Sequence, residues 1–251
     1  MGAMKLFSSP PAEPDPSHWL SETKLLLLER HLGMCGPTLR QAGLWRAALG
    51  YWVRWQASLE AVWPEDEEKT VMQQLEEDWL AKNSLREACL DIDELRSKLR
   101  VAPAVQIWSR QQWGHRLDSL YLQSKSMLDR ASCRLLRLSN KNLAQELYHR
   151  VKAGESSFEV VARQFGEGPE ATQGGLIPLT FLGAMPYGLA PLLLRLEEGK
   201  LSNPLRLNDG FCLVQLECYK PTVLDVATEE LLLSEQLRLW IDSIVDRLVV
   251  V

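Results

Sequence analysis

The side chains best suited to chemistry in this chain are its cysteines, histidines and carboxylates. Of the five cysteines only Cys212 and Cys218 lie near each other, and no C-x-x-C pair occurs. This spacing predicts neither a zinc site nor a disulfide framework. The four histidines share no close spacing and are expected on helix faces: His18, His31, His115 and His149. We therefore expect no metal and no cofactor.

An acidic run, Glu65-Asp66-Glu67-Glu68, directly follows Pro64. Proline is common at the first position of a helix, and acidic side chains in the first turn interact favourably with the helix dipole. We interpret the run as a helix start rather than a ligand site.

The composition is that of an ordinary globular protein, with 46% hydrophobic and 24% charged residues. The net charge of -5 and the pI near 5.5 give no reason to expect a nucleic-acid partner. No apolar run approaches the roughly 18 residues of a membrane span, and the first residues lack the apolar core of a secretory signal. We expect a cytoplasmic protein, whose reducing surroundings keep its cysteines free.

Most of the chain has helical periodicity. Residues 1–16 hold four prolines and no periodic pattern, so they are expected to be a disordered tail. Residues 17–130 predict a tryptophan-rich helical module, completed by a long amphipathic helix over 225–248 that needs an apolar partner. The expected helices run over 17–32, 37–63, from 64 onward, 91–100, 103–130 and 225–248.

Residues 131–221 differ in character from their surroundings, since none of the nine tryptophans lies there. Strands are expected at 132–138 and 211–218, the second preceded by the turn signal Asp209-Gly210. Between them, helices are expected after the capping residue Asn140, from Ser156 or Ser157 to Phe165, and near 187–196.

Three motifs in this segment follow one another in a recognisable order. They are AQELYHRVKAGESSFEVVARQF, then Gln173-Gly174-Gly175-Leu176, then Gly199-Lys200-Leu201-Ser202-Asn203-Pro204. Together they resemble the parvulin-type peptidyl-prolyl isomerases, and the flanking helices resemble those of the SurA and PrsA chaperone-isomerases. The implied fold is α+β: a helical module with an inserted domain, residues 131–221, of a small antiparallel sheet and surrounding helices.

The resemblance also implies a site. The two core histidines of the family fall on Cys133 and Cys212, its threonine on Leu207, and its loop acid or thiol on Glu167 or Gly168. The methionine of the proline pocket falls on Met185 and its aromatic partner on Leu189, while Phe181 and Tyr187 lie close enough in sequence to supply the missing ring. If the strands pair as in parvulins, the two thiols are expected to be near neighbours.

Each of these positions has more than one interpretation. Cys133 and Cys212 are inert core residues, remnants of the catalytic network, or a redox pair. The four apolar positions are plain core or a substrate groove, and Glu167 is a solvated loop residue or an acid. The resemblance implies an isomerase and chaperone that binds extended, proline-containing polypeptide clients. The alternative is a non-catalytic peptide-binding chaperone or adaptor for folding or export of a client protein.

Overall fold

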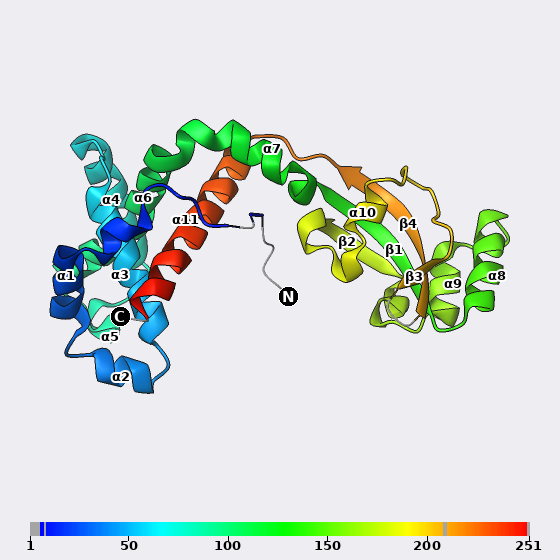
Figure 1. Ribbon diagram of the computed structural model, residues 1–251, viewed down its shortest axis with the longest axis horizontal. Coiled ribbons are helices and arrows are strands. Elements are labelled where there is room, and N and C mark those ends of the chain that lie inside the picture. Colours follow the sequence, from blue (N-terminus) through cyan, green and yellow to red (C-terminus); the bar gives the residue numbers. More distant parts are fainter. Residues whose placement is uncertain (1–5, 8, 208–209, 250–251) are drawn as a thin grey trace. The chain divides into compact units, whose positions relative to one another are not determined.

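The computed structural model describes residues 6, 7, 9–207 and 210–249. The chain divides into two compact units, here called the sheet unit and the helical unit. The sheet unit is built mainly from Leu122–Leu224, and the helical unit from Phe7–Tyr121 together with Asp225–Val251 (Figure 1). None of the described helices combines the length and apolar character needed to cross a membrane.

The helical unit is organised around its C-terminal helix. Its elements are η1 (Pro16–Leu20), α1 (Glu22–Leu32), α2 (Gly36–Gln41), α3 (Trp45–Glu60), α4 (Glu65–Leu80), α5 (Leu85–Ala88), α6 (Ile92–Trp113), η2 (Gly114–Arg116) and α11 (Val226–Leu248). Helix α11 packs against η1, α3 and α6. The helix α7 (Leu117–Leu128) contributes residues to both units.

Tryptophans form the centre of this unit. Trp240 of α11 is fully buried, and its ring lies 4.8 Å from that of Trp108 and 5.2 Å from that of Trp19. The indole N–H of Trp240 donates to the Pro14 carbonyl at 2.7 Å, and that of Trp113 donates to the Glu13 carbonyl at 2.6 Å. The described part of the predicted disordered tail is therefore held by hydrogen bonds near Glu13 and Pro14, which corrects that expectation. Residues 1–5 and 8 lie outside the described residues.

Two helix predictions in this unit are wrong. The helix expected over 37–63 is divided into α2 and α3, because Gly43 between them adopts a left-handed φ of 71°. The break expected before Pro103 does not occur, and α6 continues through it. A complete capping box formed by Asp91 and Glu94 and packing against α3 support α6 despite the lost hydrogen bond.

The sheet unit contains one four-stranded antiparallel sheet of order β2-β1-β4-β3. Its elements are β1 (Arg130–Leu138), α8 (Lys141–Lys152), α9 (Phe158–Phe165), η3 (Pro169–Gln173), β2 (Leu176–Phe181), η4 (Leu182–Ala184), η5 (Pro186–Gly188), α10 (Ala190–Leu193), β3 (Leu205–Leu207) and β4 (Gly210–Lys220). The helix expected near 187–196 is shortened to α10, because Tyr187 and Gly188 both have left-handed backbone conformations. The α+β fold class is confirmed.

Each face of the sheet has its own hydrophobic core, because side chains alternate between faces along a strand. One core joins Leu136, Leu138 and Leu213 to apolar residues of α8 and α9. The other joins Cys133, Leu135, Cys212 and Val214 to the segment from Leu182 to Leu193. This second face is the one that positions the candidate site.

Candidate active site on the sheet

The two predicted thiols lie on the same face of the sheet but are not neighbours. Cys133 pairs with Leu216, and Cys212 pairs with Arg137, four positions further along β1. A strand rises about 3.3 Å per residue, so roughly 13 Å separates the two positions along the strands. A disulfide requires Cα atoms about 4.4–6.8 Å apart. The expectation of neighbouring thiols is therefore wrong, and this register rules out a redox pair.

Burial keeps both thiols protonated. Cys133 is 0% exposed and Cys212 is 1% exposed. Burial raises the pKa of the Cys133 thiol to about 12, with a smaller contribution from the negative charge of Glu217, and raises that of Cys212 to about 11. The thiolate is the reactive form of cysteine. Neither side chain is therefore a nucleophile at neutral pH.

These shifts predict a loss of stability in alkaline solution. Above the ordinary thiol pKa of 9.0, the unfolded chain releases protons that the folded chain retains, so the free energy of unfolding falls as pH rises. The buried neutral thiols make their full contribution to the free energy of unfolding below pH 9. This contribution is lost as the pH approaches the pKa values of the thiols in the folded chain. Between pH 9 and 10 the loss is about 1 kcal/mol for each thiol. Urea unfolding of the wild type and of C133A/C212A checks this, because the variant should lack that part of the decrease.

The predicted apolar pocket residues are assembled only in part. Met185 and Leu189 pack in the same core as the two cysteines, and Leu207 packs against that core at its edge. Met185 is 7% exposed and Leu189 is 4% exposed, so little of their surface faces solvent. Phe181 pairs with Arg130 at the start of β1, and its ring stacks under that guanidinium at 4.2 Å. Phe181 is therefore far from the end of β1 where Leu207 and Tyr187 lie.

Glu167 is a structural carboxylate at the end of β1. It accepts hydrogen bonds from the Ser139 backbone N–H at 3.0 Å and from the Ser139 hydroxyl at 2.9 Å. These bonds lower the pKa of Glu167, so it is ionised and unsuited to donate a proton at neutral pH. Glu167 and Leu207 both line a hollow of about 320 Å³, with Arg137 beside them.

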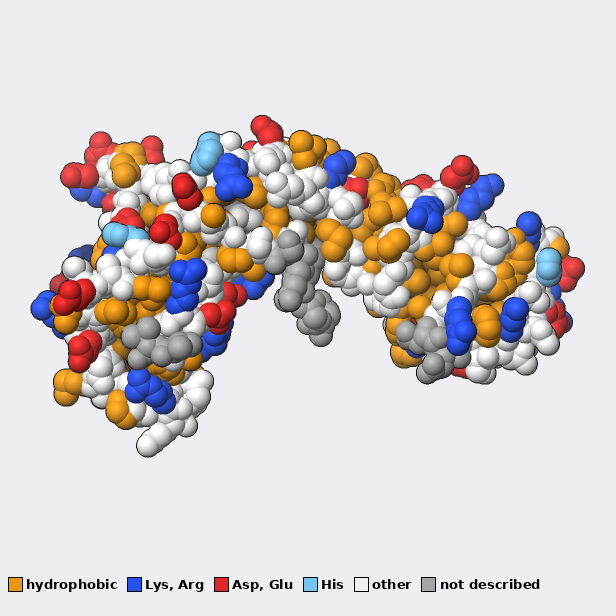
Figure 2. Space-filling model, in the orientation of Figure 1, with side chains coloured by type: hydrophobic (Ala, Val, Ile, Leu, Met, Phe, Trp, Pro, Cys, Tyr) orange, Lys and Arg blue, Asp and Glu red, His pale blue; other side chains and the backbone are white. Residues whose placement is uncertain are grey.

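Figure 2 shows hydrophobic side chains spread over the visible face of the sheet unit.

Sequence reasoning did not anticipate a polar cluster around Arg137. Its guanidinium makes two hydrogen bonds to the Glu170 carboxylate, at 2.6 and 3.1 Å, and lies over the Tyr187 ring at 4.6 Å. The Glu170 partner raises the pKa of Arg137. Arg137 thus links η3 to the η5 segment beside Met185. The alternation of β1 predicts the face on which Arg137 lies, since Arg137 follows Cys133 and Leu135 on that face, but it does not predict the partner Glu170.

A second unanticipated network closes the opposite end of the sheet. The buried carboxylate of Asp129 accepts from the Tyr219 hydroxyl and, at 2.8 Å, from the Thr222 backbone N–H. Burial, followed by the hydrogen bond to Asp129, raises the pKa of Tyr219 to about 12. The Asp129 carbonyl also accepts from Leu182 N–H at 2.7 Å. This network fixes the start of the segment that covers the cysteine face.

The Gly-Gly turn holds the start of β2 against β1. The Gly175 carbonyl accepts from Leu135 N–H at 2.8 Å, and the φ of Gly175 is 79°. A Cβ atom at this position would lie 2.6 Å from the Leu135 carbonyl oxygen. This close backbone approach explains why glycine is required here.

We expect Gly175→Ala to lower the free energy of unfolding by about 3 kcal/mol, combining left-handed strain with a backbone collision. Gly154→Ala is the matched control, because Gly154 also has a left-handed φ of 75° but nothing lies within 4 Å of its added Cβ. The control should lose only about 1 kcal/mol. Thermal and urea unfolding measure both, and equal losses would show that the approach to Leu135 is unimportant.

Among the described residues, no group of three or more histidine, cysteine or acidic side chains could hold a metal ion. The arrangement instead offers an apolar sheet face, a neighbouring hollow and fixed charges at its rim. The antiparallel sheet of order β2-β1-β4-β3, with α8 and α9 on one face and a Gly-Gly turn into β2, is the small sheet with surrounding helices that the sequence resemblance implied.

Residues 135–218 match the Rotamase family model, described as a PPIC-type PPIASE domain. The match covers a third of the chain and confirms that this segment resembles that family, as the sequence motifs indicated. No curated protein matches the chain.

Several solved structures are similar to the chain at low identity. The crystal structure of the peptidylprolyl isomerase PrsA from Bacillus anthracis is 14% identical with a TM-score of 0.45, covering 78% of this chain and 92% of that one. A PpiC-type isomerase domain is 20% identical with a TM-score of 0.35, covering 40% and 99%. A structure of the SurA-like chaperones PEB4 and Cj1289 of Campylobacter jejuni is 16% identical with a TM-score of 0.37, covering 72% and 80%. At such scores these likenesses carry no functional inference.

Proposed function

We propose that the sheet unit binds proline-containing polypeptide segments and catalyses their cis–trans isomerisation with a small rate acceleration. The observation that carries this proposal is the isomerase-type sheet, whose Met185 and Leu189 lie in the core of the expected substrate face. The chain would act on extended or unfolded polypeptide clients, as an isomerase and chaperone.

Isomerisation of a peptide bond requires little chemistry from the sheet face that holds Met185 and Leu189. Rotation about a peptide bond has a barrier of about 18–20 kcal/mol and breaks no covalent bond. An apolar surface that displaces water from the bond lowers the barrier, because the twisted amide is less polar than the planar one. We expect the catalysed rate to be slow, because this face has few side chains that can form strong hydrogen bonds. Cysteine is a weak hydrogen-bond donor, and Leu207 has no polar atom to contribute.

The deciding experiment is exchange NMR on an Ala-Leu-Pro-Phe peptide, with and without the full chain. Uncatalysed isomerisation takes tens to hundreds of seconds. We expect a measurable but small acceleration, together with chemical-shift changes near Met185 and Leu189. Exchange at the uncatalysed rate with saturating chain would exclude the enzymatic part of the proposal.

The second candidate is a non-catalytic peptide-binding chaperone or adaptor. The burial and protonation of Cys133 and Cys212 favour it, because the positions of the family histidines then serve only packing. Peptide-induced chemical-shift changes without acceleration would support this function. Absence of both effects would leave a purely structural role for the sheet unit.

We also propose a reducing, cytoplasmic setting. Its support is that all five cysteines are free, with Cys35 and Cys89 exposed. Cell fractionation of the native host would test this location.

A further inference from the structure

The sheet face on which the proposed isomerase function depends is covered in this structure. Met185 and Leu189 are almost completely buried. Residues 182–193, here called the cover segment, carry both side chains and pack onto the face that holds Cys133 and Cys212. A proline ring can reach Met185 and Leu189 only if part of the cover segment moves. The contacts that hold this segment in place therefore control access to the face.

One side chain in the middle of the cover segment is held by a residue of the sheet. The ring centroid of Tyr187 lies 4.6 Å from the guanidinium carbon of Arg137 in β1. The carboxylate of Glu170 in η3 fixes this guanidinium through hydrogen bonds of 2.6 and 3.1 Å. Gly168 leaves space for the pair, because an added Cβ atom there would collide with both side chains. The position of Tyr187 thus depends on a pre-formed ion pair.

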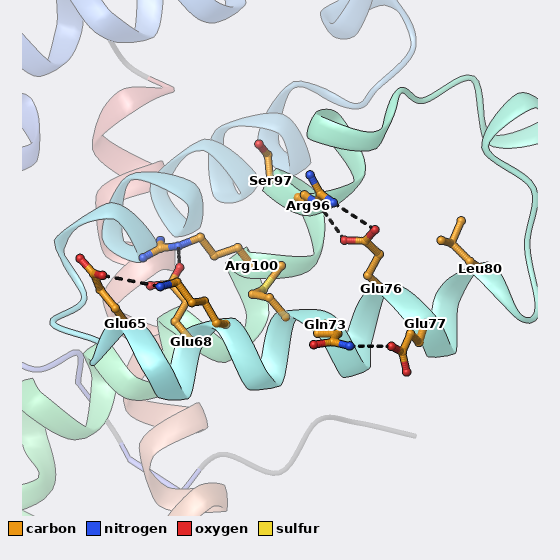
Figure 3. Close-up of a pocket in the computed structure, with 11 residues that line it drawn as sticks. Glu65, Glu68, Gln73, Glu76, Glu77, Leu80, Arg96, Ser97 and Arg100 are labelled. Carbon is orange, nitrogen blue, oxygen red and sulfur yellow. Dashed lines mark hydrogen bonds and ion pairs between the residues drawn. The ribbon is translucent and has the colours of Figure 1, made fainter.

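The ion pair that fixes Arg137 is partly enclosed. Figure 3 shows a contrasting pair in the helical unit, where Arg96 of α6 lies 2.8 Å from Glu76 of α4 and Arg96 is exposed. Exposed pairs of that kind contribute little to stability. Arg137 and Glu170 are only 28% and 10% exposed, so water competes less for their charges. Arg137 is therefore a well-fixed cation for the Tyr187 ring.

Tyr187 itself has a backbone conformation that is unfavourable for its residue type. Its φ is 58°, and among the described residues Cys89 is the only other non-glycine residue with a positive φ. The Cβ atom makes this left-handed region unfavourable, and strained residues persist where surrounding contacts hold them. The Tyr187 side chain is also 40% exposed, so burial contributes little to holding it. The stack on Arg137 therefore offsets a local strain.

We propose that Tyr187 is a positioning residue for the isomerase function: its stack on Arg137 keeps the cover segment closed, and an X-Pro segment binds after this contact is released. The inference rests on the proposed function of the sheet unit. When only a minor, open population can bind, the apparent dissociation constant is the intrinsic constant divided by the open fraction. Weakening the stack should therefore strengthen peptide binding, which is the opposite of damage to a binding site.

The decisive variant is Y187A, which removes the ring and keeps the left-handed strain. A cation–π contact at a partly exposed site changes a conformational equilibrium by a factor of about two to five. We expect Y187A to bind the Ala-Leu-Pro-Phe peptide tighter by this factor in an NMR titration. Without peptide, Cys212 of this variant should react with N-ethylmaleimide faster by the same factor. Y187F retains the ring and should match the wild type in both measurements.

The matched control is Y148A. Tyr148 packs on the opposite face of the sheet, and the ammonium of Lys152 lies 5.2 Å from its ring centroid. This variant also loses an aromatic ring and its cation contact, but Cys212 labelling and peptide affinity should stay at wild-type values. Y187G removes both the ring and the strain, because glycine readily adopts a left-handed conformation. Its Cys212 should therefore react more slowly than that of Y187A. Circular dichroism should show all four variants folded.

Three results would overturn the proposal: Cys212 labelling of Y187A at the wild-type rate, equal acceleration by Y148A, or weaker peptide binding by Y187A. Labelling is measured without peptide, so it tests the Tyr187 contact even if no X-Pro peptide binds. Absence of peptide binding by the wild type and by Y187A would instead exclude the proposed function of the sheet unit. Failure of either proposal is therefore distinguishable from failure of the other.

Discussion

In the native chain at pH 8, Cys133 and Cys212 should react with N-ethylmaleimide at least about a hundredfold more slowly than an ordinary exposed thiol. Two physical causes act together. Raised pKa values of about 12 and about 11, compared with 9.0 ordinarily, reduce the thiolate fraction, by roughly a hundredfold for Cys212 and a thousandfold for Cys133. Complete burial also prevents the reagent from reaching either sulfur. The exposed Cys35 and Cys89 should be labelled first.

Peptide mapping by mass spectrometry after timed quenching measures each cysteine separately. Labelling in urea provides the control, because unfolding should make all five thiols reactive. Native labelling of Cys133 at a rate close to that of Cys35 would contradict the closed face described above. If an X-Pro peptide accelerates labelling of Cys212, the segment from Leu182 to Leu193 opens on binding, and this would locate the substrate on that face.

Strands β1 and β4 and helices α8 and α9 were predictable because local signals determine them, whereas β2 and β3 were not among the expected strands. Alternating apolar residues mark β1 and β4, and the side chains of Asn140 and Ser157 cap α8 and α9 through hydrogen bonds to the first turns. Proline was a less reliable signal of a helix boundary, because packing and capping stabilise α6 as a continuous helix that includes Pro103. Local pattern therefore predicts which elements exist better than where a helix is interrupted.

The candidate site was less predictable because it depends on strand register. The sequence places Cys133 and Cys212 on strands that pair, but only the register separates them by four positions. The Arg137–Glu170 pair joins residues 33 positions apart in the chain, and the Asp129–Tyr219 pair joins residues 90 apart. Such contacts arise from the tertiary fold, so local sequence patterns do not predict them.

The same geometry determines what histidines would do at the two cysteine positions. We expect C133H/C212H to lose at least about 4 kcal/mol of unfolding free energy. A larger side chain in a closed core costs about 1–3 kcal/mol, and a buried polar group without a partner costs a similar amount. Both positions are essentially unexposed, and Met185 and Leu189 pack in the same core. We expect no faster X-Pro exchange, because the two imidazoles would be too far apart to contact each other and Leu207 could not hydrogen-bond to them.

Urea unfolding and exchange NMR on the Ala-Leu-Pro-Phe peptide measure the two effects. The control is C133A/C212A, which removes both thiols without adding volume or polarity and should be destabilised less than the histidine variant. Adding L207T to the histidine variant tests whether a polar partner at the edge of the core restores part of the stability. A stable C133H/C212H chain with exchange faster than the wild type would contradict this account. It would mean that the sheet retains a working isomerase frame and that the polar network alone was lost.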